Sequence, residues 1–375
     1  MPKESDQMPD QKRIGIIGLS AQGSWASISH LPYLQQTNLY KITALQNSTE
    51  ASAKAAAQKY SLSNVTTFND ASQIAHSSDV DIIAVSVNVP EHYKLAKPAL
   101  EAGKDVFVEW PLARNLAEAE ELVRLAKEMG VKTMVGLQAR QNPSVLKAKE
   151  IVQSGKLGKI LVTTMYGHGA IFGPTVNEGF LYALPVEAGA NLLTVPFGHA
   201  VDALCFVLGE IEDISATLAN LTPELDVISK DGKLAGKTSK TAHDHISITG
   251  QLLNGGGIVN VTYAGGVSRT KRDFVWEIVG TEGTLILEGP SNGGHVQMYQ
   301  PTLKLAKSDL QELEQIKVEE TTGFSYNVGR AWDAWANVGL NRGHTVTTFE
   351  DALLRHKMID AIYRSAKNGT RECYV

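Results

Sequence analysis

A glycine turn between a buried strand and a helix constrains this chain more than any other feature. Residues 13–26 read RIGIIGLSAQGSWA, where the apolar run from Ile14 to Ile17 ends at Gly18, and Gly23 precedes the start of a helix. Gly18 permits a tight turn and Gly23 permits a close approach of helix to strand, whereas Ser20 replaces the middle glycine of the usual pattern. This G-x-S-x-x-G predicts a turn that binds a dinucleotide. A purely structural turn in a doubly wound sheet is the alternative.

The same strand-then-helix alternation continues to about residue 138. Apolar runs recur in KITALQNS, DVDIIAVSV, DVFVE and KTMVGLQ, and helical stretches separate them, one of them bracketed by Asn115 and Gly130. Strands that are apolar throughout indicate a parallel sheet covered on both faces. We therefore predict an α/β fold in which a disordered tail (1–12) precedes a Rossmann-type, doubly wound dinucleotide-binding domain (13–140).

The pattern changes from residue 160 onward. Runs such as KILVTTMYGHG, GGIVNVTYAGG and DFVWEIVGT are longer and alternate apolar with polar residues, and glycine-rich turns join several of them. This alternation favours a largely antiparallel sheet with one face solvated or docked to a partner. Residues 141–375 are accordingly predicted to form an α+β domain with an open, mostly antiparallel sheet.

Composition limits the classes of function. A chain of 375 residues exceeds the size at which one core stops growing, so two domains are expected. The net charge of −5 argues against direct nucleic-acid binding, because phosphate contacts need clustered Lys and Arg. The two cysteines, Cys205 and Cys373, have no metal or redox spacing, and His243 and His245 lack further ligands nearby, so no metal site is predicted. No apolar run reaches membrane-spanning length and the first residues lack a signal-peptide core. We expect a cytoplasmic protein, with a nuclear location as the alternative.

The glycine turn and the end of the second strand indicate which nucleotide is bound. The turn offers Gly18, Ser20, Ala21, Gln22 and Gly23 as cofactor contacts. The second strand ends in Gln46, Asn47 and Ser48, where an NAD-binding domain usually has a carboxylate for the ribose 2′-hydroxyl. Neutral amide and hydroxyl groups tolerate a 2′-phosphate, but no arginine is present to bind it. The cofactor is therefore predicted to be NADP or NAD, with NADP slightly favoured.

Several motifs in order along the chain together resemble the glucose-fructose oxidoreductase/inositol dehydrogenase (Gfo/Idh/MocA) family. They read PEHYKLAKPALEAGKDVFVEWPLA, GLQARQNPSVLKAKEIVQSGKLGKI, FGHAVDALCFVLG and VGTEGTLILEG. The resemblance implies that the second domain's sheet carries the substrate pocket and often the oligomer contact, so a homodimer is expected. It adds these cofactor contacts: Asn88, His92, Glu109, Trp110 and Gln138.

Two of the three acid–base groups that this resemblance implies are missing. The family's Glu-Lys-Pro reads Glu109-Trp110-Pro111 here, and its later Asp-x-x-x-His begins with Val195 and keeps only His199. An indole N–H is only a donor, so Trp110 cannot shuttle a proton. Trp110 either contacts the ligand or fills the space that the lysine left, and Glu109 bonds backbone or ribose locally. His92 more often orients its loop than takes part in chemistry.

The remaining candidates for proton transfer and substrate binding lie in the second half of the cleft. His199 is the best acid–base group, with Asp202 one helical turn onward to set its tautomer. A histidine that caps a buried helix is the alternative. Tyr182 could donate a phenolic proton in reserve. Arg140 follows the last parallel strand and suits an anionic or polyhydroxyl ligand, although an ion pair between domains is equally expected.

Within the family, VEWPLA, LQARQNPSVLKAKE, FGHAVDAL and FEDALLRHKMIDAIYRSA look most like the fungal galactose-regulon repressors of the Gal80 type. The leading prediction is an NAD(P)-dependent oxidoreductase acting on an alcohol or carbonyl of a small polar metabolite, such as a sugar or polyol. The alternative is a regulatory protein that binds the nucleotide without turnover and holds a transcription activator. This chain is shorter than expected for those repressors before its final helix.

Overall fold

The computed structural model describes residues 11–253, 256–291, 293–307 and 313–375. Of the predicted tail, residues 1–10 lie outside the described residues, and Lys12 belongs to the first strand rather than to a tail. Within the described parts of the chain, no helix is both long and apolar enough to cross a membrane.

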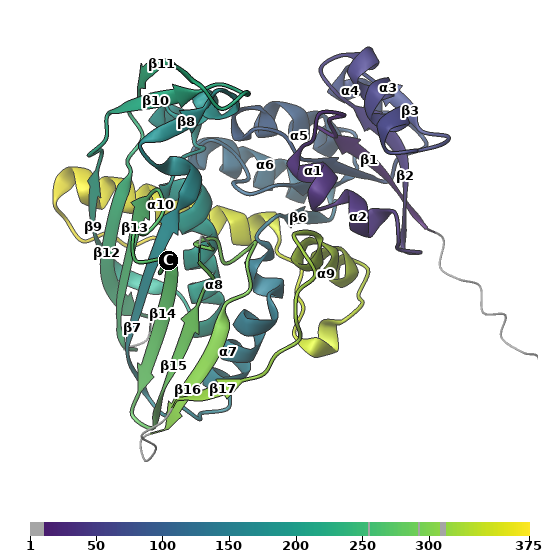
Figure 1. Cartoon of the computed structure of the whole chain (residues 1–375). Coiled ribbons are helices and arrows are strands. Elements are labelled where there is room, and N and C mark those ends of the chain that lie inside the picture. The colour runs from purple at the N-terminus through teal and green to yellow at the C-terminus, as the bar shows by residue number, and fades with distance from the viewer. Residues whose placement is uncertain (1–10, 254–255, 292, 308–312) are drawn as a thin grey trace, which may run out of the picture.

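The first part of the chain forms a six-stranded parallel sheet in the order β3-β2-β1-β4-β5-β6 (Figure 1). Ile14 in the central strand lies opposite Ile42 and Ile82, and all three side chains are buried, as expected for strands covered on both faces. The predicted doubly wound domain is thus confirmed. Its strands are β1 (Lys12–Ile17), β2 (Tyr40–Gln46), β3 (Thr66–Phe68), β4 (Ile82–Val85), β5 (Asp105–Val108) and β6 (Thr133–Val135).

Helices cover this sheet and begin and end at recognisable signals. In α6 the Asn115 side chain accepts a hydrogen bond from the Glu118 amide at 3.0 Å, and Gly130 ends the helix in the left-handed conformation. The helix after the glycine turn is broken into two short pieces around His30. The helices are α1 (Trp25–Ile28), α2 (Leu31–Leu34), α3 (Glu50–Lys59), α4 (Ala71–Ala75), α5 (His92–Glu101) and α6 (Leu116–Met129).

The second part is built on an eight-stranded sheet in the order β17-β16-β15-β14-β7-β13-β12-β9. Only β7 and β13 pair in parallel, so the predicted open, mostly antiparallel sheet is confirmed. Its strands are β7 (Ile160–Gly169), β9 (Ile211–Ala219), β12 (His245–Leu252), β13 (Ile258–Gly265), β14 (Phe274–Gly280), β15 (Gly283–Glu288), β16 (Thr302–Lys307) and β17 (Glu314–Ile316). A small sheet at one end joins β8 (Thr175–Asn177), β10 (Glu224–Ile228) and β11 (Leu234–Ser239).

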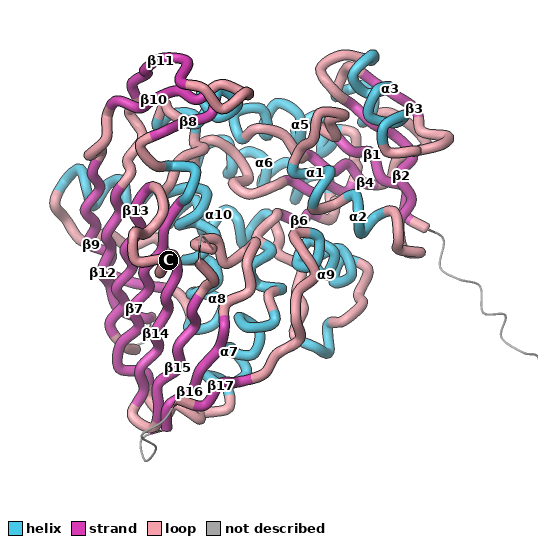
Figure 2. The backbone as a smooth tube through the Cα atoms, in the orientation of Figure 1, coloured by secondary structure: helices cyan, strands magenta, loops and turns pink. Residues whose placement is uncertain are grey.

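Three helices lie on one face of the large sheet, namely α7 (Pro143–Gln153), α8 (Gly198–Leu208) and α10 (Phe349–Asn368) (Figures 1 and 2). Side chains on that face, such as Trp276 and Tyr263, are fully buried, whereas alternate residues such as Val275 and Val279 remain partly exposed on the other face. The period of two seen in the sequence therefore reflects one packed and one open face.

The chain returns to the first domain near its end. Helix α9 (Ser325–Trp335) packs against the parallel sheet, where the backbone oxygen of Trp332 accepts a bond from the Tyr40 hydroxyl at 2.8 Å. The amide of Val135 in edge strand β6 donates to the Thr347 oxygen at 2.8 Å. The predicted boundary at residue 140 thus separates the two sheets, but the later α9 completes the core of the first domain.

Candidate functional site

The glycine turn forms the floor of a groove at the carboxyl end of the parallel sheet. Gly18 has φ +103°, and a Cβ there would lie 2.2 Å from the Ser86 oxygen, so only glycine fits. The Ser20 Oγ accepts from the Gln22 amide at 3.1 Å, which leaves its own O–H free to donate. Gly23 closes the turn by donating its backbone N–H to the Ser20 oxygen at 3.1 Å. A Cβ at Gly23 would meet no heavy atom within 4 Å, so its φ of +95°, rather than the predicted close approach of helix to strand, favours glycine there.

The groove holds about 880 Å³ and runs from the turn to the ends of β2 and β3 and the start of α5. The predicted contacts Gly18, Ser20, Ala21, Gln22, Asn47 and Ser48 all line it. The Asn47 side-chain amide donates to the Leu19 oxygen at 2.8 Å, so this group holds the turn in place, while Ser48 is exposed at the rim. Gly23 and the exposed Asn88 are not among the lining residues. A groove of this size over a turn that excludes a Cβ fits a dinucleotide.

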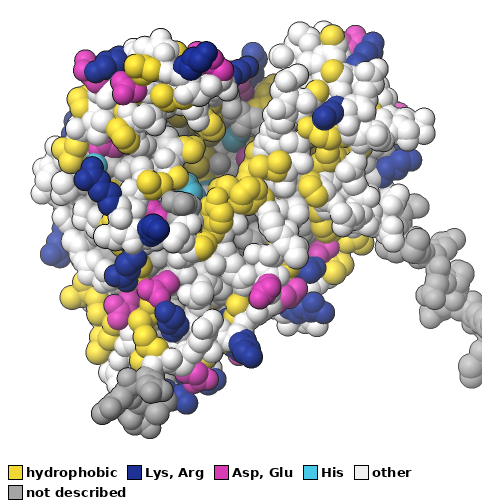
Figure 3. Space-filling model, in the orientation of Figure 1, with side chains coloured by type: hydrophobic (Ala, Val, Ile, Leu, Met, Phe, Trp, Pro, Cys, Tyr) yellow, Lys and Arg dark blue, Asp and Glu magenta, His cyan; other side chains and the backbone are white. Residues whose placement is uncertain are grey.

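A second cavity of about 470 Å³ opens beside the groove, and Val87 lines both. It lies between the first domain, the segment 170–199 and the segment 295–299, and Figure 3 shows hydrophobic side chains gathered along the hollow between the two halves of the molecule. The predicted residues His92, Glu109, Trp110, Gln138, Tyr182 and His199 all line it. The position of the cavity, at the carboxyl ends of β4, β5 and β6, is where open α/β sheets bind ligands.

Trp110 both lines this cavity and is locked into the core. Its indole N–H donates to the Thr194 oxygen at 2.7 Å, and its ring lies 5.1 Å from that of His356, centroid to centroid. The side chain is 4% exposed. Since its only polar hydrogen is committed to the backbone, Trp110 offers a ligand an aromatic surface and no proton.

Glu109 is held by a chain of hydrogen bonds that begins in α9. The Trp332 indole donates to His30 Nδ1 at 3.0 Å, and His30 Nε2 lies 2.5 Å from Glu109 Oε1. An indole can only donate, so His30 accepts at Nδ1 and must donate from Nε2 to the carboxylate. Glu109 is therefore bound by a neighbouring side chain rather than free to act as a base.

His92 ties two loops together. Its Nδ1 lies 2.7 Å from the Pro111 oxygen and its Nε2 lies 3.0 Å from the Val87 oxygen. Both ring nitrogens thus face backbone carbonyls, which matches the expected loop-orienting position.

His199 is a neutral, buried imidazole at the start of α8. Burial, with a smaller effect from the nearby His295, lowers its pKa to about 3. Its Nδ1 has no hydrogen-bond partner among the described residues. Tyr182 lies on the cavity wall, and burial raises the pKa of its hydroxyl. His199 and Tyr182 are thus brought to one cavity, as their assignment requires.

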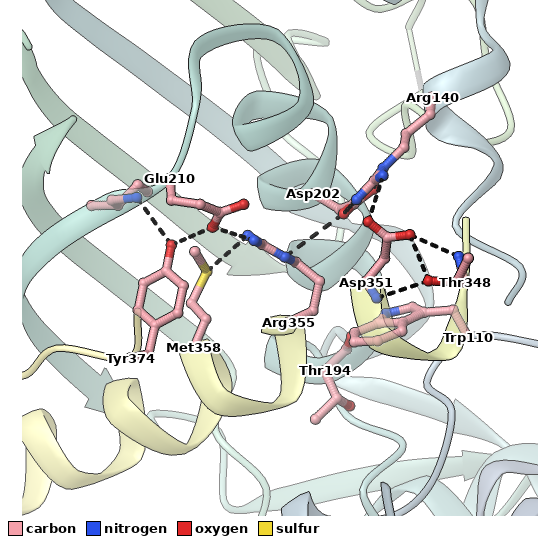
Figure 4. Close-up of polar contacts among 11 residues, drawn as sticks. Trp110, Arg140, Thr194, Asp202, Glu210, Thr348, Asp351, Arg355, Met358 and Tyr374 are labelled. Atoms are coloured by element: carbon pink, nitrogen blue, oxygen red, sulfur yellow. Dashed lines mark hydrogen bonds and ion pairs between the residues drawn. The ribbon is translucent and has the colours of Figure 1, made fainter. Parts of the chain in front are cut away.

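The structure overturns the predicted pairing of Asp202 with His199. The Asp202 carboxylate binds the Arg140 guanidinium through two bonds of 2.7 and 2.8 Å, and Arg140 also donates to Asp351 at 3.1 Å (Figure 4). Asp202 is fully buried and faces Arg355 as well. Arg140 and Asp202 are not among the residues that line the cavity, and the alternative expected for Arg140, an ion pair between the domains, forms. The reason is that an isolated buried carboxylate is costly and takes the nearest cations. Their contact with a substrate stays a prediction.

Among the buried polar residues of the cavity, three were not predicted from the sequence, namely Ser86, His295 and Gln297. Ser86 directly follows β4, so the rule that ligands lie at the ends of parallel strands could have found it. His295 and Gln297 lie in a loop after β15 that has no recognisable motif. Burial lowers the pKa of His295 to about 4, so this second histidine is also neutral.

No group of three or more His, Cys, Asp or Glu side chains that could hold a metal ion was found in the part of the chain that the structure describes. His245 instead bonds its neighbour Asp244, at 2.8 Å from Nδ1 to Oδ1.

A dinucleotide-type groove that continues into a cavity between two domains defines a nucleotide-binding protein of the dehydrogenase type. Residues 12–137 match the oxidoreductase family with an NAD-binding Rossmann fold (GFO_IDH_MocA), and residues 143–289 match the C-terminal domain of Gal80p. The chain belongs to the Gfo/Idh/MocA oxidoreductase family and carries a Gal80-like second domain.

Its relatives include both a named enzyme and a named regulator. The chain is 36% identical to the dehydrogenase aclE of Aspergillus oryzae, over 98% of this chain and 99% of that protein. It is 35% identical to the galactose/lactose metabolism regulatory protein GAL80 of Saccharomyces cerevisiae, over 74% of this chain and 66% of that protein. The crystal structure of a super-repressor mutant of Gal80p from the same yeast superposes with a TM-score of 0.88 at 29% identity, covering 96% of this chain and 97% of that chain. The family and the nucleotide-binding fold are therefore shown, whereas turnover is a separate question.

Proposed function

We propose that the protein is an NAD(P)-dependent oxidoreductase that interconverts an alcohol and a carbonyl of a small metabolite. The observation that carries the proposal is the cavity of about 470 Å³ that meets the nucleotide groove at Val87 and contains the neutral His199. The match to a named dehydrogenase over nearly its whole length supports it.

The bound nicotinamide would accept hydride from the alcohol carbon or return it to the carbonyl. His199 would take the alcohol proton as the C–H bond breaks, and it would return that proton in the reverse direction. A histidine with a low pKa is a weak base, but the O–H becomes strongly acidic once the hydride leaves, because it then belongs to a protonated carbonyl. Trp110 would form one wall beside the reacting carbon, and the cavity's burial would exclude water.

Either nucleotide is expected to bind, with NADP slightly preferred. No carboxylate occurs among Gln46, Asn47 and Ser48, and the exposed Ser48 hydroxyl at the rim can donate to a 2′-phosphate.

The test is to follow the absorbance of the reduced nicotinamide while the protein is mixed with nucleotide and a fractionated metabolite extract, and to identify the product by mass spectrometry. His199→Gln should lower the rate by about 100- to 10,000-fold while nucleotide affinity changes less than about twofold. Tyr182→Phe is the matched variant on the same wall. Should Tyr182→Phe lose more activity than His199→Gln, the proton would be assigned to Tyr182 instead.

A second candidate is a nucleotide-binding regulator that holds a transcription activator. The specific observation in its favour is that Trp110 and Val195 stand where the family resemblance implies proton-transfer groups, together with the Gal80p-like domain over residues 143–289. This candidate predicts micromolar nucleotide binding without any turnover, and co-purification with an activator that depends on the nucleotide.

We also infer that the open face of the eight-stranded sheet joins two copies of the chain. Val162 lies opposite both Ile258 and Val279 on this face, forming an apolar row across three strands. Ile258 is 56% exposed. Sedimentation of the wild type should give a dimer, and Val279→Lys should shift it toward the monomer.

A further inference from the structure

The cavity beside the groove has an unusually apolar wall for a site expected to take a sugar. The side chains of Trp25 and Ile28 come from α1, those of Phe172, Phe180 and Tyr182 from the segment before α8, and that of Met298 from the loop after β15. Phe180 and Tyr182 lie with ring centroids 6.2 Å apart, and Tyr299 packs edge-on to Phe324 at 5.8 Å. Aromatic walls of this kind bind flat apolar groups by contact area and ring stacking.

Two large apolar side chains remain exposed at this cavity. Ile28 is 48% exposed and Ile171 is 45% exposed, and they come from different domains. Single exposed apolar residues are ordinary, but two that line one cavity would both lose water contact when an apolar ligand enters. Removal of this apolar surface from water favours an apolar occupant.

The cavity offers no charge to bind an anion. No Lys or Arg is among the residues that line it, and the nearby Arg140 is already bound to Asp202 and Asp351. The carboxylate in the wall, Glu109, is held by His30. A carboxylate or phosphate group entering here would lose its hydration without a counter-charge to replace it.

The polar groups are few and lie among the buried residues. Ser86, Gln138, His199 and Gln297 are each more than nine-tenths buried, and each has a polar atom without a partner among the described residues. Ser86 and Gln138 belong to the side at the sheet edge, where the nicotinamide would lie. On the side of the second domain, His199 and Gln297 are accompanied by His295 and by the hydroxyls of Tyr182 and Tyr299. These few groups can satisfy a small number of hydroxyls, whereas each hydroxyl of a polyol that is left without a partner would lose its hydration without a replacement.

We propose that the substrate is an uncharged alcohol or ketone with an apolar, aromatic or alicyclic body and one or two polar groups, rather than a free sugar, a polyol or a carboxylate. This inference rests on the proposed function, because it names the substrate class of the same cavity. It differs from the sugar or polyol expected from the sequence. The reaction balances as above, with hydride passing between substrate carbon and nicotinamide and the proton between substrate oxygen and His199.

Two matched pairs of probes test the proposal on the intact chain saturated with NADP or NADPH. Cyclohexanol and myo-inositol share a six-membered carbon ring but carry one and six hydroxyls, and 1-phenylethanol and mandelate differ by a carboxylate. Calorimetry should show cyclohexanol and 1-phenylethanol binding at least about tenfold more tightly than their partners, a difference of about 1.4 kcal/mol. Tighter binding of myo-inositol or mandelate would overturn the proposal, and so would binding of the nucleotide with no binding of any probe.

A variant locates the binding site and separates the two proposals. Ile171→Arg places a cation at the cavity wall, at a position where the side chain is already exposed. The affinity for mandelate relative to that for 1-phenylethanol should rise about fivefold. Leu221→Arg, at an exposed residue outside the cavity lining, is the control and should change the affinity for neither mandelate nor 1-phenylethanol. If neither nucleotide binds, the proposed oxidoreductase fails, and the ranking of the same probes on the nucleotide-free protein then decides only which class of ligand the cavity binds.

Discussion

The nucleotide groove and the cavity beside it share Val87 but are built in different ways. The groove is formed by residues 17–98, so consecutive strand–helix units provide every contact. The cavity gathers residues between 25 and 299 from both domains. Local motifs therefore determine the nucleotide half of the site, while long-range packing determines the chemical half. This difference explains why a chain can keep its groove while its acid–base groups change.

The largest expected effect tests the junction between the two regions. Gly18→Ala would place a Cβ 2.2 Å from the Ser86 oxygen, next to Val87, and should weaken nucleotide binding by about 100-fold, or about 3 kcal/mol. Gly23→Ala is the control, because Gly23 has a similar φ of +95° but no heavy atom within 4 Å of the added Cβ. It should cost only about 1 kcal/mol of backbone strain. Equal losses in calorimetric titrations of the two variants would refute the steric argument.

Acid should destabilise the fold through a buried histidine behind the cavity wall. Burial, reinforced by His92, lowers the pKa of His356 behind Trp110 to about 3. The folded chain keeps this ring neutral while the unfolded chain takes up a proton below its ordinary pKa of about 6.5. The stabilisation is therefore complete above about pH 6.5 and is lost as the pH falls toward 3, at about 1.4 kcal/mol per pH unit.

Removing this histidine should flatten the acid dependence. When the pH is lowered from 7.5 to 5, the free energy of unfolding of the wild type should fall by about 2 kcal/mol more than that of His356→Leu, as measured by urea unfolding. His76→Leu, at an exposed histidine after α4, is the control and should follow the wild-type profile. Parallel curves for the wild type and His356→Leu would show that His356 does not carry this effect.

A smaller effect is expected from a substitution in the cavity wall, which should alter stability but not nucleotide binding in the groove. Trp110→Phe keeps an aromatic ring but removes the hydrogen bond to the Thr194 oxygen, and should cost about 1–2 kcal/mol of unfolding free energy. Nucleotide affinity should stay within about twofold, because Trp110 lines only the cavity. A parallel loss of nucleotide affinity would show that the two regions are not separable.

The smallest effect concerns the rim of the groove. Ser48→Asp restores a carboxylate near the end of β2, where it can accept a bond from a ribose 2′-hydroxyl and repels a 2′-phosphate. The ratio of NAD to NADP affinity should rise about fivefold, or about 1 kcal/mol. Ser48→Thr keeps the hydroxyl and the neutral charge, so its ratio should not change. An unchanged ratio in Ser48→Asp would place the 2′ position elsewhere along the groove.

The sequence predicted most of what depends on neighbours along the chain. Gly18, the apolar strands and the position of Trp110 at a strand end follow from local rules of backbone conformation and burial. The family resemblance, rather than local pattern, placed His199 in the second domain's half of the site.

The contacts that could not be predicted from the sequence depend on which helices and strands meet in the folded chain. Asp202 lies one helical turn from His199, yet its carboxylate binds Arg140 from η2 (Gln138–Gln141) and faces Arg355 from α10. The bond from Trp332 to His30 likewise joins residues 302 positions apart. A one-turn spacing only makes contact possible, whereas the burial of a carboxylate between two arginines decides which contact forms.

The substitution at residue 110 also has an optical consequence. Of the chain's five tryptophans, Trp25 and Trp110 line the cavity, while Trp276, Trp332 and Trp335 lie in the packed cores. Reduced nicotinamide absorbs light in the range where tryptophan emits, so a nucleotide bound at this sheet edge would quench Trp110 by energy transfer. A lysine at the same position would be silent. The tryptophan that stands in place of a proton-transferring lysine thus lets intrinsic fluorescence report whether nucleotide is bound.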